Sequence, residues 1–396
     1  MQTPVRPIQD LPNRMDAVQA PIIPIVGQLI RETPGTISLG QGVVHYGPPP
    51  EAMYAIRSVL QEPFAHGYGD GAGWAPLVAR ITRKLADENA IDAGRGSKVM
   101  VTAGANMAFM HAVLAVTAPG DEVIVPLPFY FNHEMAIVMA GCRAVPVPTD
   151  ANYQLNLDAI RAALTPRTRM IVTVSPNNPS GAVLGDASLR ALNDLCRERC
   201  LYHVSDETYE FFTYGSARHV SALSFPGAAP HTFAIYSLSK AFGFAGWRVG
   251  YVAYPEHLAS AMMKSQDTIL ICPTIASQVA ALAAMEVGRA YCEPHVRELA
   301  VIRELVIEQL STLAPLVRVP PAEGAFYCLM KVETTQDPVT LNERLIKEHK
   351  VAVVPGTAFG MNDGCYFRVA YGALQKATVA EGIGRLVGGL RQLLAG

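Results

Sequence analysis

Short segments rich in valine and isoleucine alternate with helical segments through the middle of the chain, and this alternation restricts the fold more than any other feature. We expect strands at 99–102, 122–125, 144–147, 170–174, 201–205, 232–236 and 249–253. The helices expected around them lie at 51–60, 77–89, 107–116, 157–164 and 188–199. Strands separated by helices form a mainly parallel sheet covered on both faces, so the sequence predicts an α/β fold. Functional groups of such a sheet gather at the carboxyl ends of its strands.

The chain of 396 residues is long for one hydrophobic core, and its pattern changes after residue 290. A long helical stretch at 296–313 is followed there by short strands and two further helices, which predicts a smaller α+β domain. The strands are expected at 317–319, 326–332, 351–354 and 366–370, and the helices at 341–348 and 376–394. We therefore divide the chain into an N-terminal arm and loop (1–50), a large domain (51–290) and a small C-terminal domain (291–396).

Charge and hydropathy argue against two classes of partner. The formal net charge is −2, only 17% of the residues are charged, and no run of lysine or arginine is present, so we expect no nucleic-acid-binding surface. The longest apolar stretch, at 268–285, is interrupted by Pro273, Ser277 and Gln278 and is too short to span a bilayer. Residues 1–15 lack the apolar core of a secretory signal, so we expect no membrane partner.

Half of the residues are hydrophobic, which is high for a globular enzyme and suggests that part of the surface is buried against another subunit. The seven cysteines are scattered along the chain. Cys196 and Cys200 could share one side of a helix end, but neither a histidine nor a second cysteine pair accompanies them, so we expect free thiols and no metal site. These features together predict a cytoplasmic protein.

Lys240 stands in an unusual stretch, residues 237–251, which directly follows the strand expected at 232–236. Its neighbours are small or hydroxylated, and a second cation, Arg248, lies in the same stretch. A lysine in such surroundings can be desolvated and lose its proton, and the resulting amine is a nucleophile that forms Schiff bases with aldehydes. The alternative is a solvated lysine in a glycine-rich loop.

The pattern S-x-S-K followed by G-x-R-x-G-Y, from Ser237 to Tyr251, resembles the cofactor-lysine segment of the aminotransferases that use pyridoxal 5′-phosphate (PLP), fold type I, class I/II. The resemblance implies that Lys240 holds PLP as a Schiff base and that Arg248, Ser237 and Ser239 bind its phosphate. It also implies a large PLP-binding domain and a small domain that packs with the N-terminal arm, whose loop reaches the active site.

Two further segments match parts of that cofactor site. A phosphate binds well to backbone N–H groups at the start of a helix, and Gly104, Ala105 and Asn106 lie between a strand and a helix. They resemble the phosphate-binding turn of the family. The flat ring of PLP needs an aromatic partner. Tyr130 occupies the position of the family's stacking residue, whereas the adjacent Phe129 is expected in the core.

A carboxylate must keep the pyridine nitrogen of PLP protonated so that the ring can accept electrons. Asp206, directly after the strand at 201–205, matches the residue with this role, and Tyr209 matches a donor to the phenolic oxygen. Asn178 begins Asn-Pro-Ser-Gly, which resembles the family's N-P-x-G motif, and the resemblance makes it a second donor to that oxygen. It also implies a cis peptide bond between Asn178 and Pro179, a geometry that proline permits.

The amino-acid substrate brings a carboxylate, and the planar fork of an arginine pairs with both of its oxygens. Arg368, in the otherwise apolar strand expected at 366–370, matches the family's carboxylate-binding arginine. Gly42 matches the loop glycine whose backbone approaches the same carboxylate. We also expect Asn178 and Tyr46 among the substrate-binding residues.

Tyr68 matches the tyrosine that reaches the PLP phosphate of the neighbouring subunit, so the resemblance implies a homodimer with shared active sites. The matches follow the family's order over nearly the whole chain. They imply an aminotransferase that moves the amino group of an L-amino acid to a 2-oxo acid. Lys240, Asp206 and Tyr209 are then the catalytic residues, with Lys240 as general base and acid.

The absence of an arginine in the segment after Arg248 bears on the charge of the substrate's side chain. Members specific for dicarboxylates commonly carry a second arginine, and no arginine lies between Arg248 and Arg289. The loop at 43–46 is apolar and aromatic apart from its histidine, which favours a neutral, apolar or aromatic substrate. A PLP-dependent lyase or cyclising synthase on the same fold stays open, because it would use the same cofactor residues. A non-catalytic sensor joined to a DNA-binding module is disfavoured, because too few residues precede the first motif.

Overall fold

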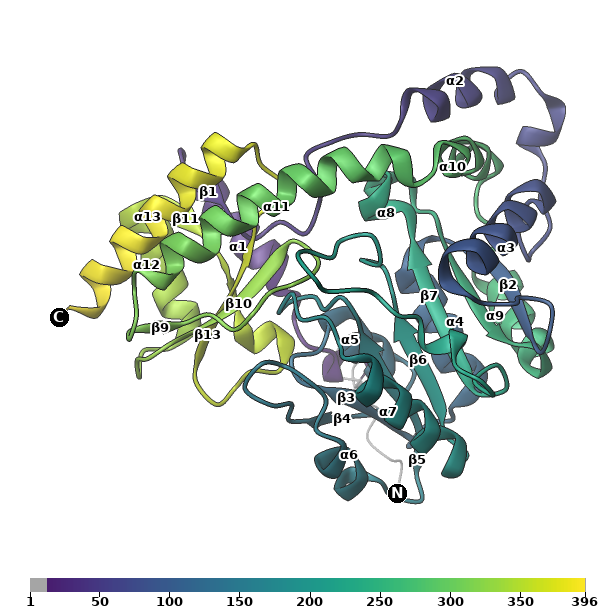
Figure 1. Ribbon diagram of the computed structural model, residues 1–396, viewed down its shortest axis with the longest axis horizontal. Helices are drawn as coiled ribbons and strands as arrows, with labels where there is room; N and C mark the ends of the chain where they lie inside the picture. The colour runs from purple at the N-terminus through teal and green to yellow at the C-terminus, as the bar shows by residue number, and fades with distance from the viewer. Residues whose placement is uncertain (1–12, 396) are drawn as a thin grey trace, which may run out of the picture.

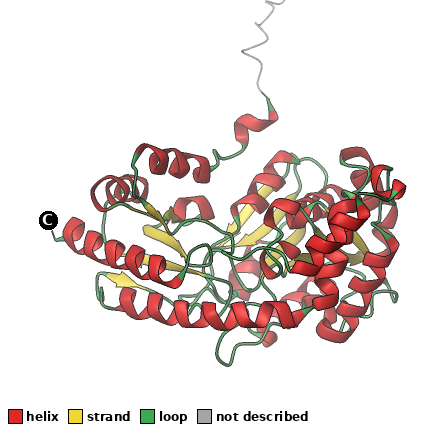
Figure 2. Ribbon diagram, turned by 90° about the horizontal axis from the view of Figure 1, so that it is seen from above, coloured by secondary structure: helices red, strands yellow, loops and turns green. Residues whose placement is uncertain are grey.

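The computed structural model describes residues 13–395, so residues 1–12 of the expected arm lie outside the described residues. The strands form a seven-stranded sheet, a four-stranded sheet and a two-stranded pair. Helices surround these strands, as Figures 1 and 2 show from two directions.

The seven-stranded sheet has the order β2-β8-β7-β6-β5-β3-β4. Its strands are β2 (Ser97–Thr102), β3 (Glu122–Pro126), β4 (Arg143–Val147), β5 (Thr168–Val174), β6 (Tyr202–Asp206), β7 (Thr232–Ser237) and β8 (Gly250–Pro255). The strands from β3 to β7 pair in parallel, whereas β8 is antiparallel to both β2 and β7. The mainly parallel sheet is therefore confirmed, and the carboxyl ends of β5, β6 and β7 share one edge.

Alternate residues of these strands enter two apolar clusters on opposite faces of the sheet. In β2, Val99 and Val101 belong to a cluster with residues of the helices α3 (Ala75–Asn89) and α10 (Ile275–Val287). Met100 belongs to a cluster with residues of the helix α4 (Gly104–Val116). Successive side chains of a strand point to opposite faces. The continuous apolar runs of the sequence therefore form a sheet that is buried on both sides.

The helices around this sheet are α2 (Pro50–Val59), α3 (Ala75–Asn89), α4 (Gly104–Val116), α5 (Phe131–Met139), α6 (Leu157–Ala163), α7 (Asp186–Glu198), α8 (Leu238–Ala241), α9 (Ala259–Ile269) and α10 (Ile275–Val287). The sequence did not predict α5, α8, α9 and α10. Helix α10 packs against α2, α3 and α11 and is apolar almost all round. A helix of this kind lacks the one-sided apolar stripe by which amphipathic helices are found.

The four-stranded sheet is antiparallel, in the order β12-β13-β10-β9. Its strands are β9 (Val317–Arg318), β10 (Tyr327–Val332), β12 (Val354–Pro355) and β13 (Cys365–Ala370), and the helices of this part are α11 (Arg289–Ser311), α12 (Pro338–His349) and α13 (Lys376–Leu394). The strand expected at 351–354 is in fact two strands. The first, β11 (Val351–Ala352), pairs in parallel with β1 (Ile37–Ser38), while β12 joins β13.

The N-terminal arm therefore packs with the C-terminal part of the chain. Its helix α1 (Ile22–Glu32) contacts α12, and the pair of β1 and β11 continues this contact. Within residues 13–395, no helix has the length and apolar character needed to cross a membrane. The seven cysteines all lie in this range and are free thiols, as expected. The domain limits at residues 50 and 290 and the cytoplasmic location stay predictions.

Candidate active site

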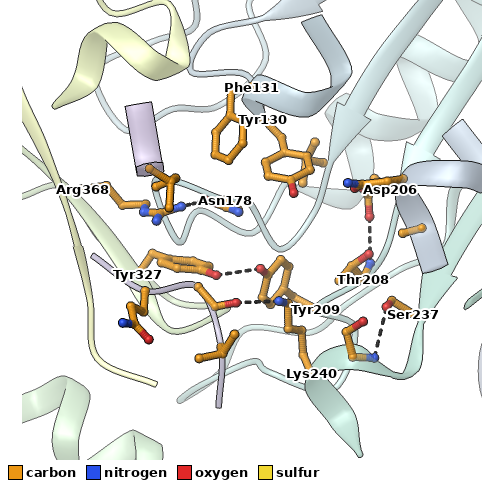
Figure 3. Close-up of a pocket in the computed structure, with 18 of the residues that line it drawn as sticks. Tyr130, Phe131, Asn178, Asp206, Thr208, Tyr209, Ser237, Lys240, Tyr327 and Arg368 are labelled. Carbon is orange, nitrogen blue, oxygen red and sulfur yellow. Dashed lines mark hydrogen bonds between the residues drawn. The ribbon is translucent and has the colours of Figure 1, made fainter. Parts of the chain in front are cut away.

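A cavity of about 410 Å³ opens at the carboxyl edge of the seven-stranded sheet (Figure 3). Asp206 and Ser237, at the ends of β6 and β7, line one side, and Tyr327 of β10 and Arg368 of β13 line the other. The predicted site residues that line the cavity are Gly42, Ala105, Asn106, Tyr130, Asn178, Asp206, Tyr209, Ser237, Ser239, Lys240, Arg248 and Arg368. Segments far apart in the sequence therefore meet where the strand pattern predicted a site.

Lys240 lies on the short helix α8, which begins where β7 ends. The side chain of Ser237 caps this helix by accepting a hydrogen bond of 3.1 Å from the backbone N–H of Ser239. The cap turns the chain sharply at the sheet edge, and Lys240 lines the cavity as a result.

The surroundings of the Lys240 amine disfavour its protonated form. Its Nζ donates a hydrogen bond of 2.5 Å to the carbonyl of Gly42 in the loop after β1. Burial, together with the charges of Arg368 and Arg248, lowers the pKa of Lys240 to about 8, against an opposing effect of Asp206. A useful fraction of the amine is therefore unprotonated near neutral pH.

Asp206 is held as a carboxylate by two donors. The Nε2 of His133 lies 3.0 Å from its Oδ2, and the backbone N–H of Thr208 donates to its Oδ1 at 3.0 Å. Burial alone would raise the pKa of Asp206, but the hydrogen bonds from His133 and Thr208 keep that pKa below its ordinary value. The carboxylate is therefore ionised at neutral pH.

The sequence did not predict His133. It lies in the first turn of α5, whose N-cap is Tyr130, and its ring stacks on Phe109 with the ring centres 4.0 Å apart. The spacing from the predicted stacking tyrosine was the available signal, but it has meaning only once α5 is known to be a helix. Because α5 was not predicted, His133, which positions Asp206, was not found from the sequence.

Aromatic and apolar side chains form a wall of the cavity. Tyr130 and Phe131 project into the cavity together, as Figure 3 shows. Burial raises the pKa of Tyr130, so its hydroxyl is neutral. Ile23 of α1 and Val43 also line the cavity, and Ile23 is a further residue that the sequence did not predict. The adjacent Phe129 is buried in the core, as expected.

Arg248 and the turn before α4 form a polar end of the cavity. The Nη2 of Arg248 donates to the carbonyl of Ala103 at 3.4 Å. Gly104 has a φ of +77° and passes so close that a Cβ there would collide with the guanidinium. Gly104 itself does not line the cavity, but its missing side chain lets Arg248 lie beside Ala105 and Asn106, which do.

Arg368 is only 2% exposed and is oriented by two hydrogen bonds. Its Nη1 donates to Asn178 Oδ1 at 2.9 Å, and its Nη2 donates to the carbonyl of Gly40 at 2.6 Å. Among the residues that the structure describes, its Nε has no hydrogen-bond partner. The cis peptide bond expected between Asn178 and Pro179 is present.

A pair of tyrosines closes the space beside Lys240. The hydroxyls of Tyr209 and Tyr327 lie 2.8 Å apart, and the guanidinium of Arg368 lies over the Tyr327 ring at 4.7 Å from its centre. A Cβ on Gly42 would lie 2.7 Å from the Tyr327 hydroxyl oxygen, so this loop position needs glycine. Burial raises the pKa of Tyr209 well above its ordinary value, and the hydroxyl is a neutral donor or acceptor.

Besides Gly104, two predicted site residues, Tyr46 and Tyr68, do not line the cavity. The hydroxyl of Tyr46 donates to the backbone carbonyl of Lys240 at 2.9 Å, and its ring stacks on His295 with ring centres 3.7 Å apart. Tyr46 therefore supports the lysine from behind the loop. Tyr68 is 85% exposed, which leaves it free to meet another subunit. Their predicted roles toward substrate and cofactor stay predictions.

Known protein families include one whose model matches this chain. The family model described as "Aminotransferase class I and II" matches residues 34–386. The chain belongs to this family. Members depend on PLP, so the resemblance seen in the sequence is confirmed, as are the fold type I architecture and the aminotransferase activity.

Relatives of this aminotransferase carry both aromatic and aspartate names. An aromatic aminotransferase of Arabidopsis thaliana is 33% identical over 394 residues, which covers 97% of each chain. An aspartate aminotransferase of Pyrococcus abyssi is 33% identical over 364 residues, which covers 91% of this chain and 93% of the relative. The crystal structure of an aromatic aminotransferase from Pyrococcus horikoshii is 32% identical, with a TM-score of 0.86, and covers 93% of this chain and 99% of that chain.

The lowered pKa of Lys240 gives a pH test. In the PLP-free aminotransferase, we expect the rate of imine formation with a simple aldehyde to rise with pH and reach half its maximum near pH 8. Above this pH the amine is unprotonated and attacks, and below it the proton blocks attack. Arg368→Ala should move the midpoint upward, because it removes a cation that disfavours the protonated amine. Imine absorbance measured against pH reports both values.

The control for this experiment is Lys264→Ala, which removes an exposed lysine on α9 and should leave the midpoint unchanged. A midpoint near 10.5, the ordinary value for lysine, would contradict the buried state of the amine described above.

Proposed function

We propose that this aminotransferase binds PLP in the cavity and moves the amino group of a neutral L-amino acid, with an apolar or aromatic side chain, to a 2-oxo acid. One observation carries the proposal. The amine of Lys240, with its lowered pKa, faces the same cavity as the Asp206 carboxylate and the Arg368 guanidinium. PLP, when bound, supplies an aldehyde carbon for the amine and a ring that accepts electrons.

The donors around the cavity fit the ring of PLP. Asp206, kept ionised by His133 and Thr208, would pair with the pyridine nitrogen and keep it protonated. Tyr130 would lie against one face of the ring. The buried Oγ1 of Thr208 has no hydrogen-bond partner among the described residues. Buried polar atoms are nearly always paired, so this atom supports a polar ligand at this end of the cavity.

The polar end of the cavity fits the phosphate. Ala105 and Asn106 offer backbone N–H groups in the first turn of α4, where the helix dipole favours an anion. Ser237 and Ser239 add hydroxyls, and Arg248 adds a full positive charge. Tyr209 and Asn178 also line the cavity and would contact the phenolic oxygen.

Lys240 is proposed to move the proton. With PLP bound, the unprotonated amine of Lys240 would take the α-proton of the amino acid and later give it back, as general base and acid. A base must be unprotonated to act, and the pKa near 8 provides this at physiological pH. Asp206 would keep the pyridine nitrogen of bound PLP protonated, so that the ring could accept electrons.

Arg368 is proposed to bind the α-carboxylate of the substrate. Asn178 and Gly40 occupy its Nη1 and Nη2 and fix the plane of the guanidinium, while its Nε is left for a ligand. A charged hydrogen bond from a fixed donor both binds and orients the substrate, which places the α-carbon near Lys240.

The substrate preference rests on the apolar wall. Ile23, Val43 and Phe131 line the cavity, and among the lining residues within 13–395 the cations are Lys240, Arg248 and Arg368. Each of these three has a role above, so a side-chain carboxylate would have no cation of this chain as its partner. Leaving such a charge unpaired in an apolar site is costly.

Replacing Lys240 tests the mechanism. Lys240→Ala removes the amine that moves the proton, so we expect turnover to fall by at least about 10²–10⁴-fold, the range typical for loss of a general base. Transfer from an amino acid to a 2-oxo acid, followed by chromatography of both products, measures this. Lys264→Ala is the control and should keep full activity. Wild-type turnover in Lys240→Ala would refute the assignment.

A panel of amino donors tests the substrate class. We expect phenylalanine, tyrosine and leucine to give at least about tenfold higher kcat/KM than aspartate or glutamate, since one unpaired charge easily costs this much. Spectral conversion of the cofactor between its aldehyde and amine forms gives each rate. Val43→Arg should raise the value for aspartate by placing a cation in the apolar wall. A wild-type preference for aspartate would reject the proposed class but leave the role of Lys240 intact.

We further propose a homodimer in which Tyr68 of one subunit reaches the cofactor phosphate of the other. Its 85% exposure in the single chain supports this, as does the hydrophobic composition. Tyr68→Ala and Lys240→Ala should each be impaired alone. Co-expressed, they form hybrid dimers with one intact site, because the unaltered Tyr68 and Lys240 then come from different chains. Activity above that of either variant is expected, and its absence would contradict sharing.

A further inference from the structure

Three side chains that can ligate a metal gather behind the active-site loop, outside the cavity. They are His45, in the loop after β1, and His295 and Glu298 on α11. One ligand atom from each of them lies within 4.8 Å of the others. His295 and Glu298 are spaced i, i+3 and so share one face of their helix.

The spacing of one pair already suits a bound ion. The Nε2 of His45 and the Oε2 of Glu298 are 3.5 Å apart. A tetrahedral ion with bonds of about 2.0–2.2 Å holds its ligand atoms roughly 3.4 Å apart. The ligand nitrogen of His295 lies within 4.8 Å of both atoms, and the partial exposure of His45 and Glu298 lets their side chains move toward it.

The second ring nitrogen of His45 is positioned as in many metal sites. Its Nδ1 lies 3.4 Å from the carbonyl of Gly372, which also accepts the backbone N–H of His45 at 2.9 Å. With the proton on Nδ1, the lone pair of Nε2 points toward Glu298. Ligating histidines commonly donate their other nitrogen to a carbonyl in this way, which fixes the tautomer and the ring orientation.

The ring of His295 is held as well. It stacks on Tyr46 with the ring centres 3.7 Å apart and the planes 9° from parallel. The stack restrains the plane of the ring, and one of its nitrogens lies within 4.8 Å of a ligand atom of both His45 and Glu298.

We propose that His45, His295 and Glu298 bind one divalent transition-metal ion of the Zn²⁺ class, which ties the active-site loop to α11. Two imidazoles and one carboxylate suit such an ion and not Mg²⁺ or Ca²⁺, which take oxygen ligands. Glu298 is 41% exposed, so the ion can enter from solvent. This link between the loop and α11 would also affect Lys240. The carbonyl of Gly42 accepts a hydrogen bond from the Lys240 amine, and the hydroxyl of Tyr46 donates one to the backbone carbonyl of Lys240.

The experiment is calorimetric titration of Zn²⁺ into the PLP-loaded enzyme without amino acids. We expect one Zn²⁺ per chain. His295→Phe keeps an aromatic ring to stack on Tyr46 but removes the ligand nitrogen, and Glu298→Ala removes the carboxylate. Removing a residue that only hydrogen-bonds to a ligating histidine lowers metal affinity by about 10–100-fold. Removing a ligand itself should cost at least as much, so we expect each variant to bind Zn²⁺ at least about tenfold more weakly.

Two controls separate this site from others on the surface. Glu304→Ala removes another exposed acid of α11, and Cys200→Ser removes an exposed thiol; neither should alter binding. Zn²⁺ should also slow amide hydrogen exchange in residues 43–47 of the wild type but not of His295→Phe. The proposal fails if Zn²⁺ does not bind, if both ligand variants bind as the wild type does, or if exchange in the loop is unchanged. A plain His45–Glu298 ion pair would give these negative results.

Discussion

The desolvated amine of Lys240 is the constraint around which the site is built. A buried lysine close to two arginines is unfavourable when protonated, and the fold accepts this cost because the amine has a carbonyl partner in Gly42 and a carboxylate nearby in Asp206. Ser237 caps the short helix α8, and the side chain of Lys240 lies partly buried in the lining of the cavity. The same desolvation makes the amine a nucleophile and a base, so the feature that lowers the stability of the protein is also the one that enables the chemistry.

The negative charge of Asp206 and the positive charge of Arg368 are each held by hydrogen bonds to other residues. Asp206 takes hydrogen bonds from His133 and Thr208, and Arg368 donates to Asn178 and Gly40, so neither ion satisfies the other. Each is left oriented toward the cavity with capacity for a ligand. A direct ion pair between Asp206 and Arg368 would make the protein more stable without a ligand. It would also leave no charged partner in the cavity for a zwitterionic substrate, whose two charges both need one.

The sequence predicted those parts of the molecule whose pattern has a local cause. Buried strands appeared as valine and isoleucine runs, and the last helix, α13, was predicted with the limits that the structure has. Lys240, Asp206 and Arg368 stood out because ionisable residues are unusual beside such strands. His133 did not, because its meaning depends on a carboxylate distant in sequence and on the unpredicted helix α5. Likewise, nothing local in His45 indicated that α11 would bring His295 beside it.

The pairing of β1 with β11 joins Ile37 to Val351, nearly the full length of the chain. During synthesis, β1 leaves the ribosome long before its partner strand exists. The strands of the seven-stranded sheet are all made once Pro255 has been added, but β1 stays unpaired until Val351 and Ala352 have been made. The loop that follows β1 and contacts Lys240 therefore gains its anchor only after β11 has been synthesised.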